Sequence, residues 1–162
     1  QQVIAVILRL ADCQVRTSEV AQAIQSYQLA RKLSVQTQQS QLESVAAVNE
    51  AALQSKSGKL GEALHLYQRA LQLDESLGDP MASAEDWLAY GKFLDDSGFP
   101  AGLAYACFVK SERLKDPLPD PEQQQLRADA AKLAGRRVGS EATAVRRNLD
   151  LSVRQALGLT VE

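Results

Sequence analysis

A period of 40 residues runs through the first two-thirds of this 162-residue chain. Displacing the sequence by 40 positions aligns a run of small and aromatic side chains with a second run of the same kind. The aligned pairs are Ala11 with Ala51, Ser18 with Gly58, Ala23 with Ala63, Ile24 with Leu64, Tyr27 with Tyr67, and Ala30 with Ala70. A further shift of 40 aligns Ala51 with Gly91 and Gly58 with Gly98; after one extra residue near Pro100, the third unit continues with Ala104, Phe108 and Ser111. A repeat of this length is typical of stacked supersecondary units, so it limits the possible folds more than any other feature.

Each repeat unit has the pattern of two helices. In the second unit, apolar residues recur at intervals of three and four from Ala63 onwards, which is the spacing of one helical face. Gly58 fits the turn before this helix, Gly78 fits a left-handed C-cap, and Asp79 followed by Pro80 can start the next helix. The pattern predicts helices near residues 2–15, 19–36, 41–56, 60–77, 82–96 and 100–114. Because helix formers dominate and aromatic residues make up only 5% of the chain, we expect an all-α fold.

The units resemble the tetratricopeptide repeat (TPR). The family's first-helix pattern is clearest in the third unit, at Trp87, Tyr90, Gly91, Leu94 and Gly98. Its second-helix pattern is clearest in the second unit, at Ala63, Tyr67 and Ala70, and the first unit is recognisable from Ile7, Leu10, Ala11, Ala23, Tyr27 and Ala30. The resemblance covers residues 3–114 and implies a right-handed solenoid of helical hairpins.

Two features depart from the family pattern. The period is 40 residues instead of the usual ~34, which implies longer helices, similar to those of kinesin-light-chain-like scaffolds. In the second unit, Glu50 and Gln54 fall where the family buries large apolar residues. We expect either that this helix is rotated or that both polar side chains have buried partners.

The repeat ends at Leu114, and residues 115–121 contain three prolines that predict a bend. A helix is predicted to start at Asp120 and Pro121, and a last helix to be capped by Ser140. Their expected apolar stripes are Leu126, Ala130 and Leu133 up to Gly135, and then Val145, Leu149, Val153 and Leu157. The expected architecture is an all-α, right-handed solenoid of three TPR-like hairpins (residues 1–38, 39–79 and 80–114), with a terminal helical hairpin at 122–162 that caps the stack.

The resemblance implies a binding surface on the first helix of each hairpin, because these helices line the concave side of the solenoid. By position, the polar residues of this surface, named here the polar face, are Arg9, Asp12, Arg16, Asn49, Lys56, Lys92 and Asp96. Its cations would hold a carboxylate or an acidic peptide through charge-assisted hydrogen bonds. The clamp that some family members use for a C-terminal carboxylate is not reproduced, since only Asn49 matches it. A solvated helical face remains the alternative interpretation.

No residue pattern in the chain predicts catalysis, a cofactor or a metal site. His65, the single histidine, lies between stripe residues and is expected to face solvent. Cys13 and Cys107 lack the spacing of a metal or redox motif, and we expect both thiols to be buried and inert. We therefore expect a protein without enzymatic activity.

The C-terminal segment is basic, within a chain whose net charge is −2. Residues 126–157 carry seven basic and three acidic side chains, a net charge of +4. The basic patch is defined by Arg136, Arg137, Arg146 and Arg147. One hypothesis is contact with nucleic acid or phospholipid, but the lack of interleaved aromatic residues disfavours nucleic acid. The simpler interpretation is that these arginines solubilise a capping helix.

Together these features predict a protein–protein interaction scaffold that binds a protein or peptide partner in its concave groove. The chain opens on Gln1 without a methionine, and we expect it to be one region of a larger regulatory protein. The alternative function is a structural spacer or self-association segment, which would stack on another copy or on an upstream repeat through residues 3–10. No apolar run approaches the ~18 residues that span a bilayer, so a membrane partner is not expected and a cytoplasmic location is favoured.

Overall fold

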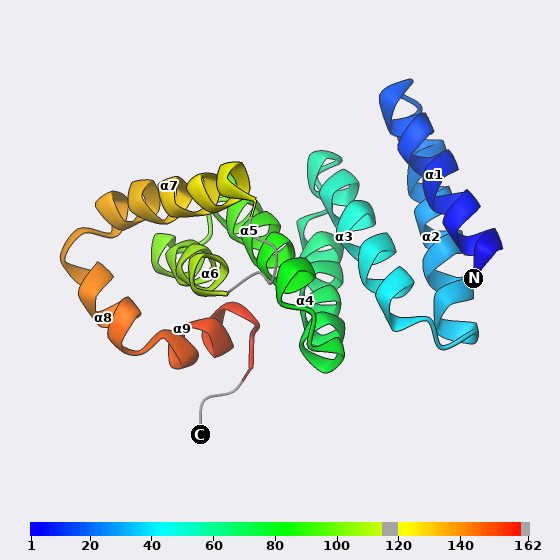
Figure 1. Ribbon diagram of the computed structural model, residues 1–162. Coiled ribbons are helices and arrows are strands. Elements are labelled where there is room, and N and C mark those ends of the chain that lie inside the picture. Colours follow the sequence, from blue (N-terminus) through cyan, green and yellow to red (C-terminus); the bar gives the residue numbers. More distant parts are fainter. Residues whose placement is uncertain (115–119, 160–162) are drawn as a thin grey trace. The chain divides into compact units, whose positions relative to one another are not determined.

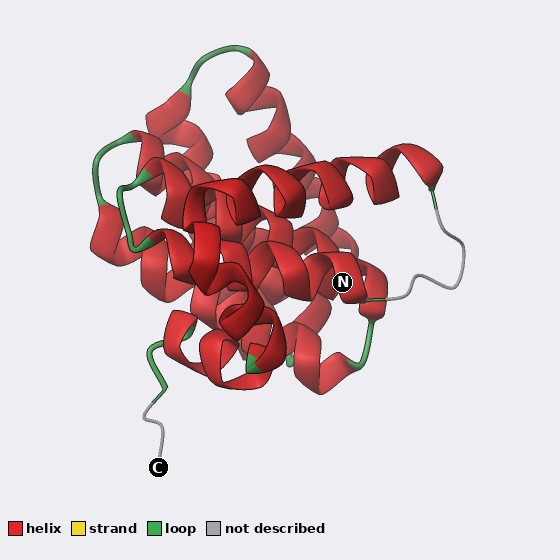
Figure 2. Cartoon of the chain, turned by 90° about the vertical axis from the view of Figure 1, so that its left-hand side faces the viewer, coloured by secondary structure: helices red, strands yellow, loops and turns green. Residues whose placement is uncertain are grey.

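The computed structural model describes residues 1–114 and 120–159 of the chain. Over these two ranges the regular structure is helical and contains no strand (Figure 2). The chain divides into two compact units, Gln1–Gly78 and Asp79–Glu162. The division falls between the second and third repeat units. Of the predicted proline-rich bend, residues 115–119 lie outside the described residues.

Helices follow one another along the chain in both units (Figure 1). The first unit contains α1 (Gln2–Arg16), α2 (Val20–Gln36), α3 (Ser40–Lys56) and α4 (Leu60–Leu77). The second contains α5 (Pro80–Asp96), α6 (Ala101–Arg113), α7 (Pro121–Val138), the short 3₁₀ helix η1 (Gly139–Glu141), α8 (Ala142–Arg147) and α9 (Leu149–Ala156). In the first unit α2 packs on α1 and α3, and α4 packs on α3; in the second unit α6 packs on α5, α7 and α9. The all-α prediction is confirmed, and the first six helices lie within two residues of their predicted bounds.

Residues in the left-handed backbone conformation recur every 20 positions, in the turns between the helices. The backbone angle φ is positive at Ser18 (64°), Gln38 (54°), Gly58 (79°), Gly78 (66°) and Gly98 (75°). Glycine takes this conformation without steric cost, whereas serine and glutamine bring a Cβ atom close to the backbone. The alignment of Ser18 with Gly58 and Gly98 in the sequence therefore reflects one shared turn geometry.

A serine hydrogen bond repeats within two of the hairpins. The Ser44 hydroxyl of α3 donates to the carbonyl of Ala70 in α4, at 3.4 Å. In the next hairpin the Ser111 hydroxyl of α6 donates to the carbonyl of Ala84 in α5, at 2.6 Å. Ala84 is the repeat equivalent of Ser44, and Ser111 is the repeat equivalent of Ala70. The donor therefore lies on the first helix in one hairpin and on the second helix in the other. The one-residue shift near Pro100 is thus present in the structure as well as in the sequence.

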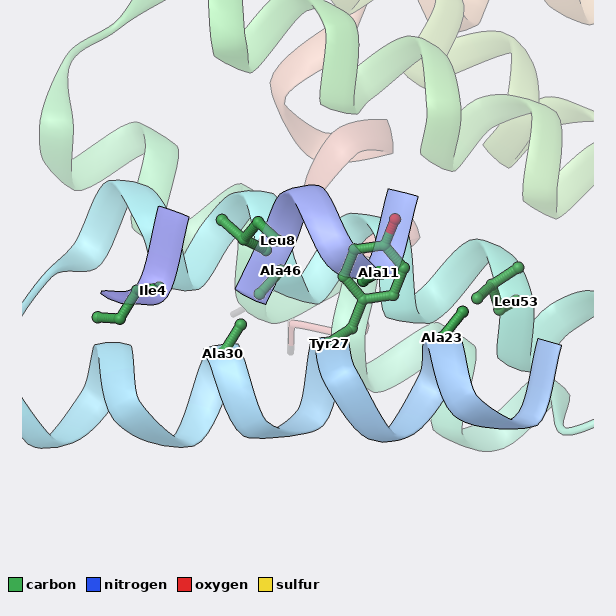
Figure 3. Packing of buried hydrophobic residues seen from close by; sticks show 8 residues of the cluster. All are labelled: Ile4, Leu8, Ala11, Ala23, Tyr27, Ala30, Ala46 and Leu53. Carbon is green, nitrogen blue, oxygen red and sulfur yellow. The ribbon is translucent and has the colours of Figure 1, made fainter. Parts of the chain in front are cut away.

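Three helices share the core of the first unit. Ile4, Leu8 and Ala11 of α1 and Ala23, Tyr27 and Ala30 of α2 are joined there by Ala46 and Leu53 of α3 (Figure 3). Ala11, Ala23, Ala30 and Ala46 are completely buried. Because alanine has a short side chain, the helix axes can approach closely, and the Tyr27 ring fills the remaining space. The first hairpin therefore buries its apolar stripe partly against the second.

The polar residues that depart from the family pattern are both buried on α3, but only one has partners. The Glu50 carboxylate accepts hydrogen bonds from Arg31 Nε at 2.9 Å and from Gln28 Nε2 at 3.1 Å. Both donors lie on α2, so the expectation of a buried partner is confirmed for Glu50. The Gln54 amide is fully buried, and neither of its polar atoms has a hydrogen-bond partner within the described residues. A buried amide without a partner costs stability.

Close approaches between helices organise the second unit. A Cβ atom on Gly91 of α5 would lie 2.6 Å from the Phe108 ring of α6. A Cβ atom on Gly135 of α7 would lie 3.1 Å from the Tyr105 ring, also of α6. On its other side α6 is covered by α9.

Two predictions for the terminal helices are wrong. The stripe on α7 is shifted by one residue: Ala131 and Ala134 are buried, whereas Leu126 and Leu133 are 44% and 55% exposed. The physical reason is that α7 packs on α6 through this side, where the Tyr105 ring lies next to Gly135. Ser140 does not cap a helix, because it lies inside η1, and the chain then forms α8 and α9 in place of one helix. The predicted start of α7 is confirmed, since the Asp120 carboxylate accepts a hydrogen bond from the backbone NH of Glu122 at 3.0 Å.

The contact at Gly91 yields a test of the α5–α6 packing. Gly91→Ala should lower the free energy of unfolding by about 1–3 kcal/mol, because the added methyl group overlaps the Phe108 ring. Gly61→Ala is the matched control, since Gly61 lies in α4 with open space around it, and this change should raise stability by up to about 1 kcal/mol. Urea unfolding followed by circular dichroism measures both. Equal effects of the two substitutions would contradict the close packing of α5 on α6.

Candidate functional site

The polar face begins on α1, where Arg9, Asp12 and Arg16 follow at intervals of three and four residues. All three side chains are exposed. On α3 the equivalent positions of the two arginines are Asn49, which is half-buried, and Lys56, which is exposed. The helices α1 and α3 both belong to the first unit and contact each other.

Two members of the polar face are held by contacts within the chain. The Asp12 carboxylate accepts a hydrogen bond from the Tyr27 hydroxyl at 2.5 Å. Burial of the phenol, together with this acceptor and its negative charge, raises the pKa of Tyr27 above its ordinary value. Asn49 Nδ2 donates to the carbonyl of Val45 on its own helix at 3.0 Å. Asp12 and Asn49 therefore serve the structure of the first unit directly.

The cations of the polar face differ from the other arginines of this unit. On α2 and α4, Arg31 and Arg69 are bound to the buried carboxylates of Glu50 and Glu43, with Nε–O distances of 2.9 and 2.8 Å. Within the described part of the chain, Arg9, Arg16 and Lys56 have no ion pair or side-chain hydrogen bond. Their charges are thus available to a ligand. In the second unit, Lys92 and Asp96 are exposed on α5.

The basic patch does not form one free surface. Arg137 is paired with Asp95 of α5. The Arg146 guanidinium donates to the Tyr105 hydroxyl at 2.6 Å and to Glu112 at 3.2 Å, and it lies 5.7 Å from the Tyr105 ring centre. Arg137 thus links α7 to α5, and Arg146 links α8 to α6.

The other members of the patch, Arg136 and Arg147, are exposed.

The remaining candidate groups show no reactive arrangement. His65 is exposed on α4, as expected. Cys107 is fully buried, as expected, and burial raises the pKa of its thiol. The expectation of a buried Cys13 is wrong: this thiol is exposed, because it lies on a side of α1 that none of the described helices covers. In the described residues, no group of three or more His, Cys, Asp or Glu side chains is placed to hold a metal ion, and no helix is long and apolar enough to cross a membrane.

A shallow depression of about 590 Å³ lies on α2 and was not expected from the sequence. Its lining residues are Gln28, Arg31, Lys32, Val35 and Gln36. Arg31 and Gln28 already bind Glu50, so two of the polar groups in the depression are engaged with α3. The sequence indicated this contact between α2 and α3 only through Glu50, because a carboxylate at a buried position of the repeat requires a cation nearby.

Comparison of the chain with protein-family models, with curated proteins and with solved structures gave no match.

The hydrogen bond between Asp12 and Tyr27 predicts that Asp12 contributes to the stability of the first unit, whereas the unpaired residues of the polar face do not. Asp12→Ala removes the acceptor of a nearly buried phenol and should lower the free energy of unfolding by about 1–2 kcal/mol. Arg16→Ala, one helical turn further along α1, should change it by less than about 0.5 kcal/mol. Thermal and urea unfolding of the two variants measure the difference. If both variants were as stable as the parent chain, Asp12 would be a free surface residue and not part of the hairpin.

Proposed function

We propose that the chain is a non-enzymatic protein-binding module whose polar face captures an acidic peptide or an exposed carboxylate of a partner protein. The supporting observation is the set of unpaired cations Arg9, Arg16 and Lys56 on α1 and α3. Carboxylates bind such cations through short, charge-assisted hydrogen bonds. Helices built on a packed core hold these side chains in place before the ligand arrives, which lowers the ordering cost of binding.

The proposed architecture is that of a TPR-like solenoid. The 40-residue period, the repeated left-handed turns and the repeated serine hydrogen bond support hairpins of one kind. We propose that three such hairpins stack with a right-handed sense and that α7, α8 and α9 form the terminal cap.

A role of the basic patch in binding nucleic acid or phospholipid has less support. Arg137 and Arg146 are bound to Asp95 and Glu112, so their charges are largely compensated within the unit. We therefore propose the polar face as the binding surface.

Charge reversal on the polar face tests this function. The probe is a fluorescent polyglutamate peptide with a free carboxyl terminus, and its binding to the 162-residue chain is followed by fluorescence anisotropy. The variant Arg9→Glu, Arg16→Glu, Lys56→Glu should bind at least about tenfold more weakly, because three exposed charge contacts of ~0.5–1 kcal/mol each become repulsive. Helical content should stay the same, because none of these side chains has a partner in the described residues.

The matched control carries the same change of net charge elsewhere. Lys32→Glu, Lys132→Glu, Arg147→Glu reverses three exposed cations outside the polar face. This variant should keep its affinity within about twofold at an ionic strength of ~0.15 M, where distant charges are screened. Equal weakening of both variants, or no binding by the parent chain, would contradict the proposed site.

A further inference from the structure

The first helix is apolar on two sides. Its inner side, with Ile4, Leu8 and Ala11, is buried against α2. Its outer face is defined here by Val3, Val6, Leu10 and Cys13, which recur at intervals of three and four residues and form one stripe. Val3, Val6 and Leu10 are 66%, 64% and 52% exposed, and Cys13 is exposed as well.

The repeat shows what covers such a face. A shift of 40 residues maps the outer face of α1 onto Glu43, Ala46, Glu50 and Leu53 of α3, all of which are buried. Ala46 and Leu53 lie in one cluster with Tyr27 and Ala30 of α2 (Figure 3). Glu50 is bonded to Arg31 and Gln28, which also belong to α2. Apart from Glu43, which is bonded to Arg69 of its own hairpin, this face of α3 is therefore the surface on which the second helix of another hairpin packs.

The second unit buries the same stripe of its own first helix. Tyr90 and Phe93 of α5 are the equivalents of Leu10 and Cys13, and they are 0% and 4% exposed. The Tyr90 hydroxyl donates to the carbonyl of Ala156 at the end of α9. Of the three first helices, α1 thus differs by leaving this stripe in contact with solvent.

We infer that the outer face of α1 is a docking surface for the second helix of a further helical hairpin, seated on α1 as α2 is seated on α3. This surface is separate from the polar face. Leu10 replaces Glu50 at its centre, so the incoming helix should carry apolar side chains where α2 carries Gln28 and Arg31. An arginine at the position of Arg31, whose side chain is 36% exposed on α2, would be partly desolvated there without a carboxylate to bind, which is unfavourable.

The α2 helix of a second copy of this chain does not supply the docking helix. It carries Arg31 and Gln28, and the α2 surface that would dock is already covered by its own α3. The occupant is accordingly a hairpin whose second helix is apolar at these two positions.

An in-register duplication tests the inference on the full chain. A second copy of residues 1–40 is joined ahead of Gln1, so that the added hairpin is connected to α1 as the first hairpin is connected to α3. In the added copy, Gln28→Leu and Arg31→Leu supply the apolar surface, and Cys13→Ser removes its thiol. The remaining Cys13 on the outer face is then the reporter, since Cys107 is fully buried.

Docking should slow the alkylation of this Cys13 by N-ethylmaleimide at least about tenfold relative to the chain without duplication, because the thiol reacts only when the added hairpin opens. The matched control keeps Gln28 and Arg31 in the added copy, and its protection should be much weaker. Adding Leu10→Glu to the receiving α1 of that control should restore protection, since it recreates the pair of Arg31 with Glu50.

Three results would overturn the inference. The first is an unprotected Cys13 in the apolar duplication and in the restored pair alike. The second is equal protection of Cys13 in all the duplicated chains, because the docking would then not depend on which side chains the two helices carry. The third is a dimer of the parent chain in analytical ultracentrifugation that Leu10→Glu dissociates, because the occupant would then be a second copy.

Discussion

The contact between α2 and α3 is the interaction on which the first unit depends. A two-helix hairpin has an apolar stripe that its own two helices cannot fully bury, so it needs a neighbour. Here Ala46 and Leu53 of α3 complete the cluster around Tyr27. Glu50 lies in the same contact and is bonded to Arg31 across it. The apolar residues supply the burial, and the pair of buried Glu50 with partly exposed Arg31 limits which helices can be paired, because the buried carboxylate alone would be destabilising.

The sides of a first helix differ in what they contact. On α3, one side packs on α4 of its own hairpin, and a second side packs on α2 of the preceding hairpin. The remaining side is polar, and on α1 and α3 its cations Arg9, Arg16 and Lys56 are not used by the fold. The arginines that stabilise the fold, such as Arg31 and Arg69, lie on the second helices. Among the arginines of the first unit, the paired ones lie on the second helices and the unpaired ones on α1, which is the basis of the proposed binding function.

Most of the helical architecture could be predicted because its signals are local. Proline and aspartate at the start of α5, and glycine at the end of α4, act within one turn of the helix they limit. The partners of Glu50 lie 19 and 22 residues away on another helix, so the sequence indicated only that partners were needed. The orientation of α7 was mispredicted because its leucine stripe competes with a stripe of small residues, and the Tyr105 ring of α6 decides between them. On the polar face, the exposure of Arg9 could be predicted, but not the bond that engages Asp12.

Comparison of two fragments by circular dichroism tests most directly whether the first hairpin depends on the second. Residues 1–38 contain α1 and α2 alone, and residues 1–78 contain the whole first unit. If burial against α3 holds the hairpin together, the longer fragment should unfold cooperatively on heating, while the shorter one should have little helix and no transition, as expected of short helices without tertiary contacts. A fragment 1–38 with the same helical content per residue and the same melting temperature as 1–78 would contradict this dependence.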